Sequence, residues 1–139
     1  MTEDTASIRL QDVQGTVLCI EDHVASMELV EAMLAGFTSL RLLKAYTGQQ
    51  GIEMAQTERP DLVLLDMRLP DISGLDVVRA LNQLISQRAL RVVLLTSDTF
   101  SIEVVKAMSL GAHEYWPKPL SRERIVTGVA RLLGGPQRS

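Results

Sequence analysis

Short apolar runs alternate along this chain with segments of helical period, and this alternation constrains the fold more than any other feature. The apolar runs predict strands at residues 16–21, 40–45, 61–66, 90–96 and 112–116. Helices are predicted at about 24–36, 47–58, 100–110 and 121–133, and a further helix opens at Gly74 and carries Val77, Leu81, Leu84 and Ile85 on one face. Strict alternation predicts an α/β fold with a parallel sheet covered by helices on both sides.

The length of 139 residues suits one domain, which we expect at 15–133, between an N-terminal tail at 1–14 and a C-terminal tail at 134–139. A net charge of −3 argues against nucleic-acid binding, and a binder that uses the basic last helix is the weaker alternative because no recognition motif accompanies it. No apolar stretch reaches the roughly 20 residues that span a bilayer. The N-terminus lacks the layout of a signal peptide, and the single cysteine, Cys19, is expected to be buried and inert. These features predict a cytoplasmic protein.

Charged and hydroxyl side chains follow four of the predicted strands. They are Glu21 and Asp22 after the first strand, Asp66 at the end of the third, Thr96 at the end of the fourth and Lys118 after the fifth. In open α/β sheets, sites form beyond the carboxyl ends of the strands. If these strands are neighbours, the side chains meet at one edge.

Three carboxylates at one edge repel each other, and a hard divalent cation such as Mg²⁺ relieves this repulsion. Glu21, Asp22 and Asp66 carry −3 in formal charge, which Lys118 and one Mg²⁺ neutralise. Such a site suits a phosphoryl group, whose transfer depends mainly on positioning and charge neutralisation. A carboxylate can itself be the nucleophile and form an aspartyl phosphate.

Four stretches resemble the receiver domain of bacterial two-component response regulators. They are "VLCIEDH", "DLVLLDMRLPDISGLDVV", "VVLLTSD" and "GAHEYWPKPL", and the resemblance covers residues 16–133. It implies a flavodoxin-like (βα)5 three-layer sandwich with a five-stranded sheet of order 2-1-3-4-5. It also implies phosphotransfer from the phosphohistidine of a sensor histidine kinase or a histidine phosphotransfer domain.

The resemblance implies a role for each matching position of the metal and phosphoryl site. Asp66 matches the phosphoacceptor and Asp22 the direct Mg²⁺ ligand, with Mn²⁺ as a possible substitute. Glu21 matches a ligand that acts through water. Arg68 matches the position whose backbone carbonyl binds the metal, and Lys118 matches the cation that pairs with a phosphoryl oxygen.

The resemblance also implies a switch. Thr96 matches the hydroxyl that moves to the phosphoryl group, and Tyr115 matches the aromatic ring that turns inward. The surface formed by the fourth helix, fifth strand and fifth helix then changes, and a downstream protein or a second copy would bind there. A cis peptide bond is implied at Lys118-Pro119, and strand alternation places Trp116 in the core.

The predicted function is a signalling switch with self-phosphotransfer and self-dephosphorylation, rather than a turnover enzyme. It is either a stand-alone regulator or a segment of a hybrid kinase or larger regulator. The alternative is a phosphorylation-independent pseudo-receiver that acts as a protein scaffold. His23 is expected to line the loop near the site, but neither His23 nor His113 is expected to be a phosphohistidine or a metal ligand. An aspartate-nucleophile phosphatase of the haloacid-dehalogenase type is excluded, because its nucleophile lies near the first strand.

Overall fold

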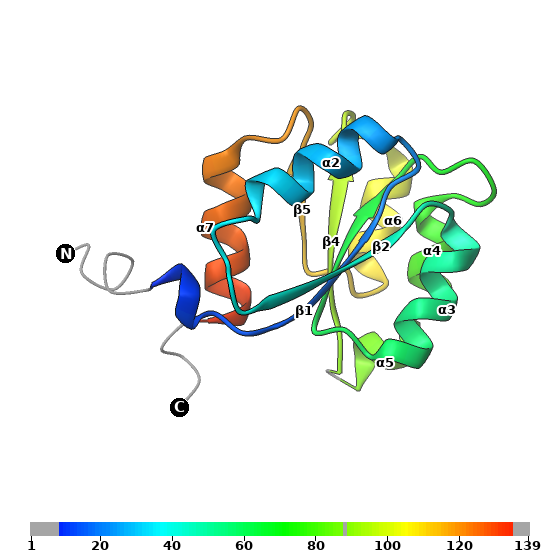
Figure 1. Ribbon diagram of the computed structural model, residues 1–139. Coiled ribbons are helices and arrows are strands. Elements are labelled where there is room, and N and C mark those ends of the chain that lie inside the picture. Colours follow the sequence, from blue (N-terminus) through cyan, green and yellow to red (C-terminus); the bar gives the residue numbers. More distant parts are fainter. Residues whose placement is uncertain (1–8, 88, 135–139) are drawn as a thin grey trace.

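The computed structural model describes residues 9–87 and 89–134, and a parallel sheet forms its centre (Figure 1). Its strands are β1 (Gly15–Ile20), β2 (Leu40–Ala45), β3 (Leu62–Asp66), β4 (Arg91–Thr96) and β5 (Glu114–Pro117). The strand order is β2-β1-β3-β4-β5, and every pairing is parallel. The implied flavodoxin-like sheet is therefore confirmed. The fifth strand begins and ends later than its predicted bounds, 112–116.

Helices cover both faces of this sheet. They are α2 (Val24–Met33), α3 (Gly48–Glu58), α4 (Gly74–Ala80), α5 (Asn82–Ser86), α6 (Ile102–Ser109) and α7 (Arg122–Leu133). The helices α2 and α7 lie over one face, and α3, α4 and α6 lie over the other (Figure 1). The three-layer prediction is confirmed.

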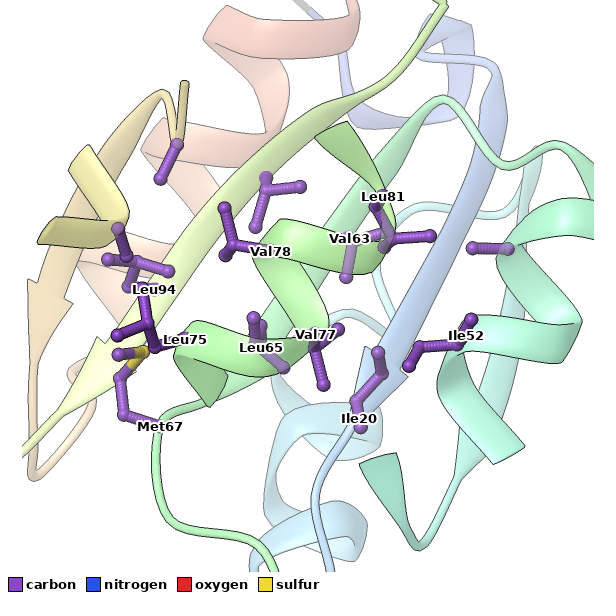
Figure 2. Packing of buried hydrophobic residues seen from close by; sticks show 14 of the residues in the cluster. Ile20, Ile52, Val63, Leu65, Met67, Leu75, Val77, Val78, Leu81 and Leu94 are labelled. Carbon is purple, nitrogen blue, oxygen red and sulfur yellow. The ribbon is translucent and has the colours of Figure 1, made fainter. Parts of the chain in front are cut away.

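The central strand β3 shows why the sheet needs two helical layers. All five of its residues are buried. Successive side chains of a strand point to opposite faces, so Val63 and Leu65 pack under α4 while Leu62 and Leu64 join the core beside α2 and α7. Figure 2 shows Leu65 beside Val77 of α4 and Val63 beside Leu81, which follows that helix. A strand that is apolar on both sides must be covered on both sides.

The helix predicted from Gly74 is interrupted at Leu81, which separates α4 from α5. The Leu81 N–H donates to both Val77 O (3.0 Å) and Val78 O (3.2 Å), so this turn is tightened and the regular helix stops. The predicted face is nevertheless present, because Val77 and Leu81 are buried and Ile85 packs against the same core. The helix predicted at 24–36 ends at Met33, within a turn of its predicted end.

Side-chain caps begin four of the helices. Thr47, Ser73, Ser101 and Ser121 each accept a hydrogen bond from the backbone N–H three residues later, at the start of α3, α4, α6 and α7. The corresponding residue of α2 is His23, whose side chain makes no such bond. Its imidazole lies instead near the end of β1.

The tryptophan on β5 joins this strand to α7. Trp116 is buried, as predicted, and Gly128 faces it so closely that a Cβ at this glycine would collide with the indole ring. The Trp116 Nε1–H donates to Glu114 Oε1 (2.7 Å), and both Glu114 oxygens accept from the guanidinium of Arg131 (2.9 and 3.0 Å). The last helix is therefore held against β5 by packing and by charge-assisted hydrogen bonds.

The described residues before β1 pack on the domain. Leu10–Asp12 form a 3-10 helix, and Val13 is 1% exposed. Gly134 lies against the Val13 side chain, so the segments before β1 and after α7 meet on one side of the molecule (Figure 1). Within 9–87 and 89–134, no helix is long and apolar enough to cross a bilayer.

Candidate functional site

The carboxyl edge of the sheet gathers the residues that the sequence singled out. Glu21 and Asp22 follow β1, Asp66 and Thr96 are the last residues of β3 and β4, and the Lys118 N–H donates to Thr96 O (2.8 Å) directly after β5. Because β1, β3, β4 and β5 are consecutive in the sheet, these five residues meet at one edge. The predicted convergence is thus observed.

Lys118 joins two buried carboxylates at this edge. Its Nζ lies 3.2 Å from Glu21 Oε1 and 3.2 Å from Asp66 Oδ1. Glu21 is 1% exposed and Asp66 is 3% exposed. Buried carboxylates are stable only when they are paired, and one ammonium group cannot neutralise two. The edge therefore keeps an excess of negative charge.

The pKa directions at this edge follow from that arrangement. Burial and the nearby charge of Glu21 hold the pKa of Asp66 above its ordinary value, although the Arg68 N–H and Lys118 act in the opposite direction. Burial also acts to raise the pKa of Glu21, but the His23 N–H and the charge of Lys118 outweigh it and lower that pKa. Burial acts to lower the pKa of Lys118, but the charges of Asp66 and Glu21 outweigh it and raise that pKa.

A second set of contacts involves the acidic pair after β1. Glu21 Oε2 accepts from the His23 N–H (3.2 Å) and lies 3.2 Å from His23 Nδ1. Asp22 Oδ1 is a buried atom that lies 3.3 Å from the same Nδ1 and has no hydrogen-bond partner within the described chain. A buried oxygen without a donor is costly unless a cation or water binds it.

These groups could hold a divalent cation. Glu21, Asp22, His23 and Asp66 each offer one ligand atom, and the four atoms lie within 4.8 Å of one another. Sequence reasoning did not include His23 in this cluster. The available signal was its position, directly after an acidic pair at the end of a strand.

A pocket of about 150 Å³ opens beside the carboxylates. Its walls include Asp66, Arg68, Thr96 and Lys118. The Arg68 N–H donates to Asp66 Oδ1 (3.1 Å), and this contact fixes the turn that follows β3. The pocket can therefore admit a small polar group to the Asp66 carboxylate.

The two predicted switch residues lie on neighbouring strands. The Thr96 hydroxyl accepts from the Asp98 N–H (3.0 Å) and lies 3.1 Å from Asp98 O, so it is bonded within its own loop. Tyr115 lies on β5 and is 42% exposed. Its side chain is therefore partly accessible to solvent on this edge strand.

Two other predictions are confirmed near this edge. The Lys118-Pro119 peptide bond is cis. Cys19 is fully buried, and burial together with the charges of Glu21 and Asp66 raises the pKa of its thiol to about 12. The thiolate is therefore disfavoured at neutral pH.

A five-stranded parallel sheet of this order, with carboxylates and a lysine gathered at its carboxyl edge, defines a flavodoxin-like domain. The chain belongs to the response regulator receiver domain family, whose model matches residues 17–130. Members of this family are components of two-component signalling, and they interact with histidine kinases or phosphotransfer proteins.

Curated relatives and solved structures agree with this membership. The chain is 32% identical over 124 residues to the DNA-binding response regulator MtrA of Mycobacterium tuberculosis, covering 89% of this chain and 53% of MtrA. It is 29% identical over 119 residues to PilH of Pseudomonas aeruginosa, covering 86% of this chain and 98% of PilH. The chain thus spans about half the length of MtrA and nearly all of PilH.

The receiver domain of the sensor histidine kinase PA1611 from Pseudomonas aeruginosa has a similar fold. Its TM-score is 0.76 at 24% identity, and the match covers 88% of this chain and 99% of that one. That structure is described with a magnesium ion coordinated in its active-site cleft.

Proposed function

We propose that this chain accepts a phosphoryl group on Asp66 from a phosphohistidine, in a reaction that depends on Mg²⁺. The observation that carries the proposal is Asp66 itself, a buried carboxylate 3.2 Å from Lys118 Nζ at the side of an open pocket. Burying a carboxylate without full neutralisation is unfavourable, and such carboxylates are found mainly at functional sites. The donor would be a sensor histidine kinase or a histidine phosphotransfer protein.

The acidic cluster fits a magnesium ion. Its donors are carboxylate oxygens, and the buried Asp22 Oδ1 needs a partner. Asp22 and Asp66 would bind the ion directly, Glu21 through a water, and Arg68 through its backbone carbonyl, and Mn²⁺ could replace Mg²⁺. When bound, the ion supplies positive charge that neutralises the carboxylates and the phosphoryl oxygens. The magnesium in the PA1611 receiver supports this assignment.

The transfer step uses groups already in place. The Arg68 N–H and the Lys118 Nζ both contact Asp66 Oδ1, so Oδ2 is the oxygen proposed to attack phosphorus. A bond forms between Oδ2 and phosphorus while the phosphorus–nitrogen bond of the donor breaks, and the bonding pair returns to the donor imidazole. Lys118 holds a phosphoryl oxygen and offsets the charge that it brings.

The negative charge of the transferred phosphoryl group would drive the proposed switch. Phosphorylation replaces a carboxylate of −1 with a group of about −2 whose oxygens require donors. Thr96 would leave its contacts with Asp98 to donate to the phosphoryl group, and Tyr115 would turn inward into the space released. The surface formed by α6, β5 and α7 would then bind a downstream protein or a second copy. The shift requires better contacts in the inward state.

Intact mass spectrometry tests this function. The full chain is treated with a small phosphodonor, with Mg²⁺ and with a chelator. One phosphoryl group that is stable in acid and labile in base should appear only with Mg²⁺, and Asp66→Asn should remove it. Asp71→Asn, which changes an exposed carboxylate in the loop after β3, is the matched control and should keep it. Equal labelling of Asp66→Asn would contradict the assignment, and unlabelled wild type would favour the scaffold alternative.

A further inference from the structure

We propose that His23 is a direct ligand of the divalent cation, through Nδ1, and that it makes the site prefer transition-metal ions over Mg²⁺, with the preference rising from Mn²⁺ through Co²⁺ to Ni²⁺. This inference rests on the proposed metal site. It adds to that site a nitrogen donor that the all-oxygen ligand set does not contain.

The spacing of His23 and Asp22 matches that of neighbouring ligands, and Glu21 lies beside them. His23 Nδ1 lies 3.2 Å from Glu21 Oε2 and 3.3 Å from Asp22 Oδ1. Donors bound at right angles around an ion, with bonds of about 2.1 Å, lie about 3 Å apart. An ion can therefore be shared between Nδ1 and the Asp22 oxygen with little movement. Asp22 Oδ1 is also the buried oxygen that lacks a hydrogen-bond partner within the described residues, so its lone pairs are available.

The local backbone explains why the imidazole lies there. His23 occupies the N-cap position of α2 with an extended backbone (φ −88°, ψ 121°). The residues at this position of α3, α4, α6 and α7 use their side chains to cap their own helices, but His23 does not. Its side chain lies against the acidic pair at the end of β1 and is 72% exposed. Ligation therefore requires no rearrangement of the core.

The chemistry of the donor decides which ions benefit. Mg²⁺ prefers oxygen ligands, and an imidazole adds little to its binding. Affinity for nitrogen-containing sites rises from Mn²⁺ through Co²⁺ to Ni²⁺. Adding one imidazole to a carboxylate site should therefore increase the affinity for Ni²⁺ most and the affinity for Mg²⁺ least. Loss of the imidazole should reduce Ni²⁺ affinity at least about tenfold and Mg²⁺ affinity less than about twofold.

Two measurements on the full chain test this directly. Electron spin echo modulation of bound Mn²⁺ detects a coordinated imidazole nitrogen, and titration calorimetry gives the affinities for Mg²⁺, Mn²⁺ and Ni²⁺. Wild type should show nitrogen modulation, and His23→Gln should lose it together with the Ni²⁺ preference. His113→Gln is the matched control, because His113 precedes β5 at the opposite edge of the sheet and is the other histidine of the chain. It should behave as wild type.

A third variant separates this inference from the proposed function. Asp22→Asn should weaken the binding of every ion. If Asp22→Asn does so while His23→Gln keeps both the nitrogen modulation and the Ni²⁺ affinity, His23 is not a ligand and the proposed carboxylate site remains. If Asp22→Asn binds all three ions as wild type does, the site is elsewhere and both proposals are wrong.

Discussion

Asp66→Asn should stabilise this protein when no divalent cation is present, because it removes one charge from a crowded edge. The ligand oxygens of Glu21 and Asp22 lie within 4.8 Å of that of Asp66. At an effective dielectric constant near 20, each of these repulsions is about 3.5 kcal/mol, while the attraction to Lys118 at 3.2 Å is about 5 kcal/mol. The two repulsions exceed this attraction, so together these charges disfavour the ionised form of Asp66 by about 2 kcal/mol. Partial exposure of Asp22 and Lys118 reduces this to about 1–2 kcal/mol.

Asparagine preserves the shape of the side chain and can still accept from the Arg68 N–H. The expected gain corresponds to a rise of about 4–8 °C in Tm for a domain of this size. Calorimetry in a chelator measures it. Added Mg²⁺ should stabilise wild type more than Asp66→Asn, since the variant loses one charged ligand.

The stability difference between Asp66→Asn and wild type should depend on pH, and the pKa of Asp66 determines its direction. The pKa of Asp66 is raised in the folded protein by burial and by the charge of Glu21, so its ionisation costs stability as the pH rises above the ordinary value of 3.8. The advantage of Asp66→Asn should therefore be absent below that value and grow above it. Asp71→Asn is the control of opposite sign, because Asp71 accepts from the Gly48 and Gln49 N–H groups and its loss should destabilise. Equal or lower stability of Asp66→Asn in the chelator, with Asp71→Asn destabilised, would refute this reasoning.

Three further predictions concern the packing of β5 and the switch. Gly128→Ala should lower the free energy of unfolding by about 1–3 kcal/mol in urea titrations, because its Cβ collides with Trp116; unchanged stability would mean that the contact is loose. Glu114→Gln should lower the free energy of unfolding by less than about 1 kcal/mol at neutral pH and should have no effect in acid. Hydrogen bonds from Arg131 and Trp116 hold the pKa of Glu114 below 4.5, so the stabilisation by the Glu114 carboxylate is lost as the pH falls below 4.5. Beryllium fluoride with Mg²⁺ should alter Trp116 fluorescence, and Thr96→Ala should weaken the change; an equal response would separate Thr96 from the switch.

The sheet and its edge could be predicted from the sequence because their determinants are local. An apolar run such as β3 can be buried only in the centre of a sheet, and the polar residue at its end then lies at the rim. The alternation of strands and helices does not determine the order of the strands in the sheet. The order 2-1-3-4-5 was implied by the resemblance to receiver domains. The same resemblance supplied the cis bond at Lys118-Pro119.

Other features depend on contacts that sequence patterns do not contain. Val13 lies in a polar stretch, yet it is 1% exposed and belongs to the core beside α2 and α7. Asp71 accepts hydrogen bonds at the start of α3, although 23 residues separate it from Gly48. The position of His23 depends on a side-chain conformation that turns back toward Glu21, which a pattern of residue types does not specify.

The identity of the phosphorylated residue is the most direct test of the central claim. The full chain is phosphorylated with a small phosphodonor and Mg²⁺, reduced with borohydride, digested and sequenced by mass spectrometry. Borohydride reduces an aspartyl phosphate to homoserine, so the modified position is read from the fragment masses. We predict homoserine at position 66 in the segment that joins β3 to α4. Homoserine at Asp71 or at Asp22, with Asp66 unchanged in a fully labelled sample, would contradict the account.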